Sequence, residues 1–237
     1  MQKGMLCRQN VTKCWFSGER SGYMPFGIQI RRIKMGFFIT VEGPNGVGKS
    51  TFIKKLEEVF SSKYKIYVTR EPSDTEFGNY VKKNEGGLYG EAYAYLIAAD
   101  RSYHLNNYVE PALDRGEIVI SDRYIESSLV LQVYDGVMTE DVWRLNCSFR
   151  IPDLSIILLG DESTISGRLC QRDILTHFEK KLTREDEIKG YIKAAKFLKD
   201  KGFNVVLFKN NTETDMINNI NKVRNIIIQL EGRIVDE

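Results

Sequence analysis

The chain has 237 residues, a formal net charge of +2 and 42% hydrophobic residues. This length suits one domain with a substantial buried core, and the nearly balanced charge gives no reason to expect broad binding to nucleic acids or membrane surfaces. No run approaches the roughly 18 apolar residues that a membrane-spanning helix requires.

The first 34 residues differ in composition from the rest of the chain. Residues 1–34 carry seven Lys or Arg against one Glu and show no clear apolar period. We expect this basic extension to be disordered, or to lie upstream of the natural start codon, with Met35 as the first residue. A mitochondrial presequence, which is also Arg-rich and acid-poor, is the alternative. The fold is therefore predicted for residues 35–237.

A phosphate-binding loop follows the first predicted strand. Phe37–Val41 is a short apolar run rich in β-branched and aromatic residues, as in a buried strand. Gly43–Ser50 then reads Gly-Pro-Asn-Gly-Val-Gly-Lys-Ser, a complete G-x-x-x-x-G-K-S motif. Between Phe52 and Phe60 apolar residues recur at helical spacing. The motif thus joins a strand to an amphipathic helix, which is the setting it requires.

This loop predicts binding of ATP. Its glycines let the backbone fold tightly around an anion, while successive N–H groups and the helix N-terminus supply a positive lining. We expect Lys49 to reach the β- and γ-phosphates and the Ser50 hydroxyl to ligate Mg²⁺. The predicted ATP-binding residues are Gly43, Asn45, Gly46, Val47, Gly48, Lys49, Ser50 and Thr51.

Four more apolar runs predict strands, and helical patterns lie between them. The strand candidates are residues 66–68, 118–120, 154–159 and 205–208, and the helical stretches are residues 92–106, 185–201 and 215–230. Near-continuous apolar strands separated by helices predict an α/β fold, a five-stranded parallel sheet of the P-loop NTPase type with helices on both faces. Gly116 and Gly202 stand where helix C-termini favour a left-handed residue, and Thr212 can cap the last helix.

Charged residues follow two of the predicted strands. Ligands of parallel sheets bind beyond the carboxyl ends of the strands, so these loops are candidate binding segments. Arg70 and Glu71 follow the second strand, where we favour a substrate role over a surface ion pair. Asp122 directly follows the third strand, from where a carboxylate can hold Mg²⁺ through its water shell. Arg123 offers a planar fork that matches a phosphate.

Two further groups of arginines are less specific. Arg101 lies beside small residues late in a helical stretch, where an Arg can point into a cleft but is more often solvated or salt-bridged. Arg168 and Arg172 follow the fourth strand and can form a lid over the triphosphate, which would stabilise the transferring group and exclude water. A solvated charged helix is the alternative. We expect no acid–base role for His177, because phosphoryl transfer depends on positioning and charge neutralisation.

The cysteines carry no metal-site signal. Cys7, Cys14, Cys147 and Cys170 are widely separated, and no C-x-x-C pair occurs among them. With only two histidines in the chain, this pattern argues against zinc and fits free thiols in a reducing cytosol. We therefore expect a cytoplasmic protein.

Taken together and in this order, these motifs resemble the thymidylate kinase family of nucleoside monophosphate kinases. The matching segments are FITVEGPNGVGKST, TREP, LIAADR, PALDRGEIVISDRY followed by two serines, PDLSIILL and the Arg-containing segment that ends in FE. The resemblance spans roughly residues 35–230. It implies phosphoryl transfer from ATP, with Mg²⁺, to a nucleoside monophosphate, foremost dTMP. It also implies an arginine-bearing lid and a homodimer, with nucleotides rather than nucleic acids or membranes as partners.

The resemblance also assigns roles to single residues. It places Arg123 and Arg70 at the acceptor phosphate and matches Arg101 with the arginine that reads the pyrimidine carbonyl. Lys49, Arg123 and a lid arginine, Arg172, would be catalytic, and Ser50 and Asp122 would organise Mg²⁺. The predicted substrate-binding residues are Asn45, Arg70, Glu71, Arg101, Arg123, Tyr124, Ser128 and Gln132.

The sequence departs from the family pattern at four places. Ile97 stands where the family has a Phe on which thymine stacks, and Leu131 where it has an aromatic under the deoxyribose. Leu159 replaces a carboxylate near the phosphates, and the lid sequence Asp-Arg-Phe-Glu reads Thr-His-Phe-Glu at residues 176–179. We expect the loss of two aromatic contacts to weaken dTMP binding by about tenfold or more, or to select a different base.

Three alternatives remain open from the sequence. A kinase for a nucleoside 5′-hydroxyl would need a carboxylate base, for which Glu71 or Glu126 could serve. A nucleotide-binding regulatory protein without turnover would explain the departures in the lid and the acceptor site. A nucleic-acid-dependent ATPase has little support, because the charge is balanced and no nucleic-acid module is recognisable.

Overall fold

The structure, a computed structural model, describes residues 36–170, 178 and 181–236, with side chains described up to residue 231. The predicted extension at residues 1–34 lies outside the described residues, as do the predicted lid arginine, Arg172, and Thr176, His177 and Glu179. None of the helices in the described part of the chain is long and apolar enough to cross a membrane.

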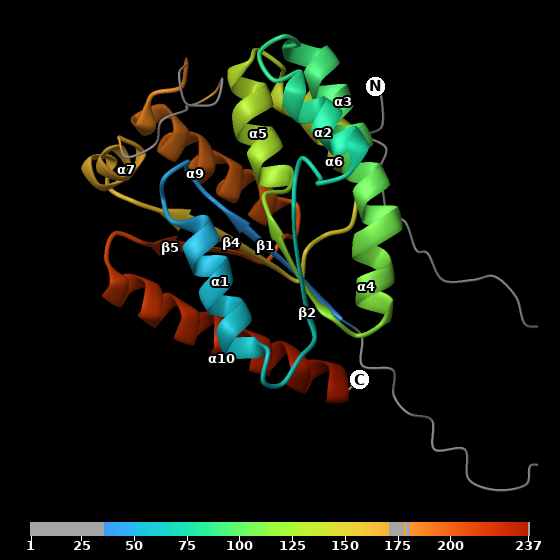
Figure 1. The fold of residues 1–237 in the computed structure, drawn as a ribbon, viewed down its shortest axis with the longest axis vertical. Coiled ribbons are helices and arrows are strands. Elements are labelled where there is room, and N and C mark those ends of the chain that lie inside the picture. The colour runs from blue at the N-terminus through green and yellow to red at the C-terminus, as the bar shows by residue number, and fades with distance from the viewer. Residues whose placement is uncertain (1–35, 171–177, 179–180, 237) are drawn as a thin grey trace, which may run out of the picture. The chain divides into compact units, whose positions relative to one another are not determined.

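Five strands form one parallel sheet in the order β2-β3-β1-β4-β5 (Figure 1). The strands are β1 Phe37–Glu42, β2 Ile66–Arg70, β3 Ile118–Asp122, β4 Leu154–Leu159 and β5 Val205–Lys209. The central strand, β1, is buried along its whole length. A strand covered on both faces reads as a continuous apolar run, which is why the sequence indicated these strands. The predicted five-stranded parallel sheet is confirmed.

Helices cover both faces of the sheet (Figure 1). On one face lie α1, α7 and α10, with bounds Lys49–Phe60, Glu162–Leu169 and Glu213–Asp236. The other face is covered by α4, α5, α6 and α9, with bounds Glu110–Asp114, Ile125–Tyr134, Thr139–Asn146 and Arg184–Asp200. The other helices in the described part of the chain are α2 Glu76–Lys83, α3 Gly90–His104 and a π-helical segment, Leu105–Val109, that leads into α4.

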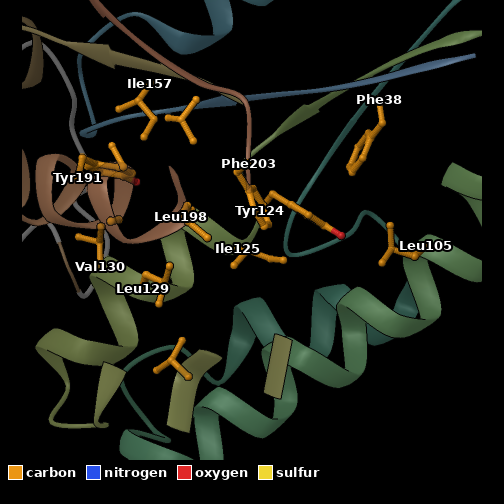
Figure 2. Close-up of a cluster of buried hydrophobic side chains, with 14 of the residues drawn as sticks. Phe38, Leu105, Tyr124, Ile125, Leu129, Val130, Ile157, Tyr191, Leu198 and Phe203 are labelled. Atoms are coloured by element: carbon orange, nitrogen blue, oxygen red, sulfur yellow. The ribbon is translucent and has the colours of Figure 1, made fainter. Parts of the chain in front are cut away.

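Successive residues of β1 point to opposite faces and so enter two separate cores. Phe37, Ile39 and Val41 pack toward α1 and α10. Phe38 packs into the second core, where its ring meets that of Tyr124 edge-on, with the centroids 5.1 Å apart. Figure 2 shows this second core, in which Tyr191 of α9 lies among side chains of α5. Both α5 and α9 are thereby fixed against the sheet close to its carboxyl edge.

Three local predictions at helix ends are confirmed. Gly116 and Gly202 follow helices with φ of 76° and 91°, the left-handed region that favours glycine. The Thr212 hydroxyl accepts a hydrogen bond from the Asp215 N–H at 3.0 Å, so it caps the start of α10.

Candidate active site

Three strands end level at one edge of the sheet and bring their loops together. In the parallel register Asp122 of β3 pairs with Val41 of β1 and with Arg70 of β2. The phosphate-binding loop after β1 and the charged segments after β2 and β3 therefore meet at the carboxyl edge, as predicted. Two cavities of about 340 and 290 Å³ lie there. We call the first the phosphate cavity, because the phosphate-binding loop lines it, and the second the acceptor cavity.

The phosphate-binding loop has the backbone that its glycines allow. Gly43, Gly46 and Gly48 have φ of 132°, 83° and 103°. A Cβ on Gly43 would come within 2.2 Å of the Leu158 carbonyl oxygen, so only glycine fits against β4 there. The phosphate cavity is lined by Asn45, Gly46, Gly48, Lys49, Ser50, Thr51, Asp122, Arg123 and Arg168.

Lys49 is folded back over its own loop. Its Nζ donates hydrogen bonds to the carbonyl oxygens of Gly43 at 2.8 Å and Pro44 at 3.1 Å, and the side chain is 7% exposed. Burial and then the nearby Arg123 guanidinium lower the pKa of Lys49 to about 8. Ser50, next in sequence, is exposed to the same cavity.

Two predicted ATP-binding residues lie outside the cavity lining. Val47 is fully buried in the core beneath the loop, and its N–H donates to the Pro44 carbonyl at 3.2 Å. Its carbonyl accepts from Asn210 Nδ2 at 2.8 Å. Gly43 takes part through its carbonyl, which accepts from Lys49. Within the described residues, Val47 supports the loop from below instead of lining the cavity.

Arg168 holds the loop to a neighbouring segment. It lies on α7, and its guanidinium donates to the carbonyl oxygens of Val47 at 2.9 Å and of Asn211 at 2.8 Å. These bonds tie the phosphate-binding loop to the segment between β5 and α10. Arg168 lines the phosphate cavity from this position, and its role as a lid cation stays a prediction. The other candidate, Arg172, lies outside the described residues.

Asp122 and Arg123 lie between the two cavities, and both residues line each of them. Asp122 Oδ1 is buried and has no hydrogen-bond partner among the described residues. The Arg123 guanidinium donates to Asn45 Oδ1, to Ser127 Oγ at 3.0 Å and to the Tyr191 hydroxyl at 3.0 Å. Arg123 has a φ of 79°, a left-handed conformation that is uncommon for a residue other than glycine.

Arg101 is both salt-bridged and part of the acceptor cavity. It is 1% exposed, and its guanidinium donates to Glu71 Oε2 at 2.7 Å, to Ser128 Oγ at 3.1 Å and to Asn146 Oδ1. The other carboxylate oxygen of Glu71 lies 3.5 Å from His104 Nδ1. The sequence left the two interpretations of Arg101 open, and the geometry combines them. Asn146 and His104 carried no signal in the sequence.

The remaining predicted substrate residues also line the acceptor cavity, in different ways. Arg70 is exposed and lies 3.5 Å from Asp74. The Tyr124 hydroxyl donates to the Arg150 carbonyl at 2.8 Å, so it is engaged on the core side. Gln132 is 3% exposed, and its buried Oε1 has no partner among the described residues. An unpaired buried acceptor beside a cavity is suited to a ligand that donates a hydrogen bond.

The acceptor cavity has an apolar wall that includes two aromatic side chains. Tyr93 and Phe178 line it together with Ile97 and Leu131, and the two aromatic side chains are 2% and 5% exposed. Tyr93, Ile97 and Arg101 follow one another at intervals of four residues, which places them on one face of α3. From this spacing the sequence could have indicated Tyr93 as a residue of the acceptor cavity.

A pair of buried carboxylates lies behind the site. Glu42, the last residue of β1, accepts hydrogen bonds from the Tyr124 and Ser127 N–H groups at the start of α5. Burial, and then repulsion from Glu126, raise the pKa of Glu42 to about 8. Glu126 is fully buried, accepts from Thr40 Oγ1 at 3.3 Å and lines neither cavity. The hypothesis that Glu126 acts as a base on a bound acceptor is therefore wrong.

Comparison with known proteins gives a consistent result. A family model described as thymidylate kinase matches residues 41–220. A probable thymidylate kinase of Caldivirga maquilingensis is 40% identical over 151 residues, or 62% of this chain and 74% of the relative. One of Thermococcus gammatolerans is 37% identical over 174 residues, or 68% and 84%. The crystal structure of thymidylate kinase from Ehrlichia chaffeensis has the same fold, with a TM-score of 0.62, 24% identity, and coverage of 81% of this chain and 99% of that one.

The phosphate-binding loop faces the acceptor cavity across Asp122 and Arg123. This arrangement is that of a P-loop nucleoside monophosphate kinase, an enzyme that transfers a phosphoryl group between two nucleotides. The family model, which matches most of the chain, identifies the family within this class of enzymes. The chain belongs to the thymidylate kinase family, whose members use ATP as the phosphate donor.

Proposed function

We propose that the protein transfers the γ-phosphoryl group of ATP to dTMP, which gives ADP and dTDP. The observation that carries this proposal is the position of Arg123, which lines both the phosphate cavity and the acceptor cavity. A guanidinium there can bind the acceptor phosphate directly opposite the γ-phosphate of ATP. The relatives are named as probable thymidylate kinases, which supports dTMP as the acceptor. ADP release from the purified protein with ATP and dTMP tests the proposal.

No strong general base is needed for this reaction. The attacking oxygen belongs to the ionised phosphate of dTMP, so catalysis comes from holding the two phosphates in line and from neutralising their charge. ATP would lie on the backbone N–H groups of the loop, and Lys49 would leave its carbonyl partners for the β- and γ-phosphates. Arg123 and Arg70 would clamp the acceptor phosphate. Arg101 and Ser128, which are already bonded to each other, would read the edge of the base.

The residues present fit a magnesium ion at the phosphate cavity. Asp122 Oδ1 is buried and unpaired among the described residues, and the Ser50 hydroxyl is exposed in the same cavity. Oxygen atoms of this kind are the ligands that Mg²⁺ prefers in proteins. When bound, Mg²⁺ neutralises charge on the phosphates. Ser50 and Asp122 would hold the ion, in part through its water molecules.

Asp122→Asn is expected to raise the Mg²⁺ concentration for half-maximal turnover by about tenfold or more. The amide keeps the size of the side chain but removes the negative charge that attracts the cation. Coupled ADP release at saturating ATP and dTMP over a series of Mg²⁺ concentrations measures the effect. Asp114→Asn, on the exposed side of α4, is the matched control. An unchanged Mg²⁺ response in Asp122→Asn would contradict the metal assignment.

Tyr93 and Phe178 provide an aromatic surface at the acceptor cavity, where the family residues at positions 97 and 131 are missing. We propose that the base packs against Tyr93. Tyr93→Leu is then expected to raise the KM for dTMP by about fivefold, because an aromatic contact contributes about 1 kcal/mol beyond its buried area. The KM for ATP should not change.

Tyr95→Leu is the matched control for this prediction, because Tyr95 lies on the same helix and is 59% exposed. Initial rates at varied dTMP measure both variants. A KM for dTMP in Tyr93→Leu equal to that of the wild type would rule out contact with the base. Weakened dTMP binding or a changed base preference, expected from Ile97 and Leu131, stays a prediction.

The positions of Glu71 and Glu126, the two predicted general bases, do not favour the alternative of a nucleoside kinase. Glu71 is engaged by Arg101, and Glu126 is buried outside both cavities. A regulatory protein without turnover is a second alternative, and the assay of ADP release with dTMP separates it from an enzyme. We further propose that residues 35–237 form the kinase domain, that the protein is a cytoplasmic homodimer and that Arg172 is the lid cation. The family resemblance supports these assignments.

A further inference from the structure

A buried carboxylate on α9 contacts the phosphate-binding loop. Glu187 is 2% exposed, and its Oε1 accepts a hydrogen bond from the Asn45 N–H at 3.1 Å. Its Oε2 accepts from Arg184 Nη1, one helical turn earlier, at 2.9 Å. A carboxylate this deeply buried is unfavourable unless it is paired and hydrogen-bonded, so both contacts hold it in place. Glu187 itself lines neither cavity.

Asn45 connects this carboxylate to Arg123. The backbone N–H of Asn45 donates to Glu187, while its side-chain Oδ1 accepts from Arg123 Nη2. The same guanidinium also donates to the hydroxyl of Tyr191. Glu187 and Tyr191 are four residues apart and so share one face of α9. One helix face therefore contacts the Arg123 system at two points, directly through Tyr191 and through Asn45.

We propose that Glu187 is a positioning residue for the acceptor phosphate. Its hydrogen bond fixes the backbone of Asn45, and the Asn45 side chain in turn fixes the direction of the Arg123 guanidinium. The direction of the Arg123 guanidinium depends on such partners, because it donates hydrogen bonds to both the Asn45 side chain and the Tyr191 hydroxyl. This inference rests on the proposed role of Arg123 at the acceptor phosphate.

Glu187→Ala is expected to raise the KM for dTMP by about tenfold, with the KM for ATP and kcat changed by less than about twofold. Glu187→Gln keeps an oxygen that can accept from Asn45 N–H and should restore most of the loss. Glu185→Ala is the control, because Glu185 lies on the same helix in a surface pair with Lys189. Initial rates at varied dTMP and at varied ATP measure all three variants.

A double-mutant cycle separates positioning from general support of the fold. Asn45→Ala removes the side chain that carries the effect to Arg123, so adding Glu187→Ala should raise the KM for dTMP no further. Effects that multiply in the double variant would overturn the inference, as would an unchanged KM in Glu187→Ala. If Glu187→Ala does not fold, as judged by circular dichroism, Glu187→Asp takes its place. The shorter side chain keeps the charge but cannot reach Asn45, and an unchanged KM in it would equally overturn the inference.

Failure of this inference can be told apart from failure of the proposed function. If the wild type turns over dTMP and Arg123→Ala raises the KM for dTMP, the assignment of Arg123 holds, and a normal Glu187→Ala counts against Glu187 alone. If Arg123→Ala leaves the KM unchanged, the proposed acceptor site itself is wrong.

Discussion

Lys49→Ala is expected to abolish turnover of dTMP while leaving the fold intact. Lys49 is the cation of the phosphate-binding loop, and its loss removes the charge that would stabilise the transferring phosphoryl group. Removal of one such preorganised group lowers kcat by about 10²–10³-fold, and we expect at least that loss here. Coupled ADP release at saturating ATP and dTMP measures it, and circular dichroism checks the fold.

Lys54→Ala is the matched control for this variant, because Lys54 is an exposed lysine on the same helix. It should turn over at the rate of the wild type. In Lys49→Ala the carbonyl oxygens of Gly43 and Pro44 lose the hydrogen bonds that Lys49 donates to them, and both residues belong to the phosphate-binding loop. Activity like that of the wild type in a folded Lys49→Ala would refute the catalytic role of the loop.

Arg123→Ala is expected to raise the KM for dTMP by about 100-fold and to leave ATP binding nearly unchanged. Arg123 lines both cavities, and its guanidinium can form two parallel hydrogen bonds with a phosphate. Loss of charged hydrogen bonds of about 1.5–3 kcal/mol each corresponds to a change of this size. Initial rates at varied dTMP, together with calorimetric titration of ATP, measure the two effects.

Arg144→Ala on α6 controls for the loss of a positive charge, because its side chain is 76% exposed and is paired only at the surface with Asp141. Its KM for dTMP should equal that of the wild type. If Arg123→Ala lost ATP binding and kept its KM for dTMP, Arg123 would belong to the donor side and the two cavities would have to be reassigned.

The sheet and the phosphate-binding loop could be predicted from the sequence because their signals are local. The strands of a covered parallel sheet are apolar along their length, as β1 is, and the loop needs glycines at fixed spacing. The helix α5 could not be predicted in this way. Ile125–Val130 is buried on all sides, and the segment includes a buried glutamate and two buried serines. Without an exposed face a helix has no amphipathic period.

Much of the site could be predicted for the same reason, and the rest depends on contacts between distant segments. Asp122 and Arg123 directly follow a strand, so their place at the carboxyl edge follows from the sheet. Glu187 lies 142 residues from Asn45, and nothing in the charged start of α9 separates it from its exposed neighbours. Val47 fits the loop motif, but its apolar side chain is drawn into the core below.

The central claim is that this chain phosphorylates dTMP. The most direct test measures ADP release from the purified protein with ATP and Mg²⁺ against dTMP, dUMP, UMP, CMP, dGMP and thymidine, each supplied separately. We predict turnover with dTMP well above turnover with every other acceptor, because the acceptor cavity joins Arg123, which we propose binds the acceptor phosphate, to Arg101 and Ser128, which we propose read the base. Absence of turnover with all six acceptors, while ATP still binds, would contradict the claim.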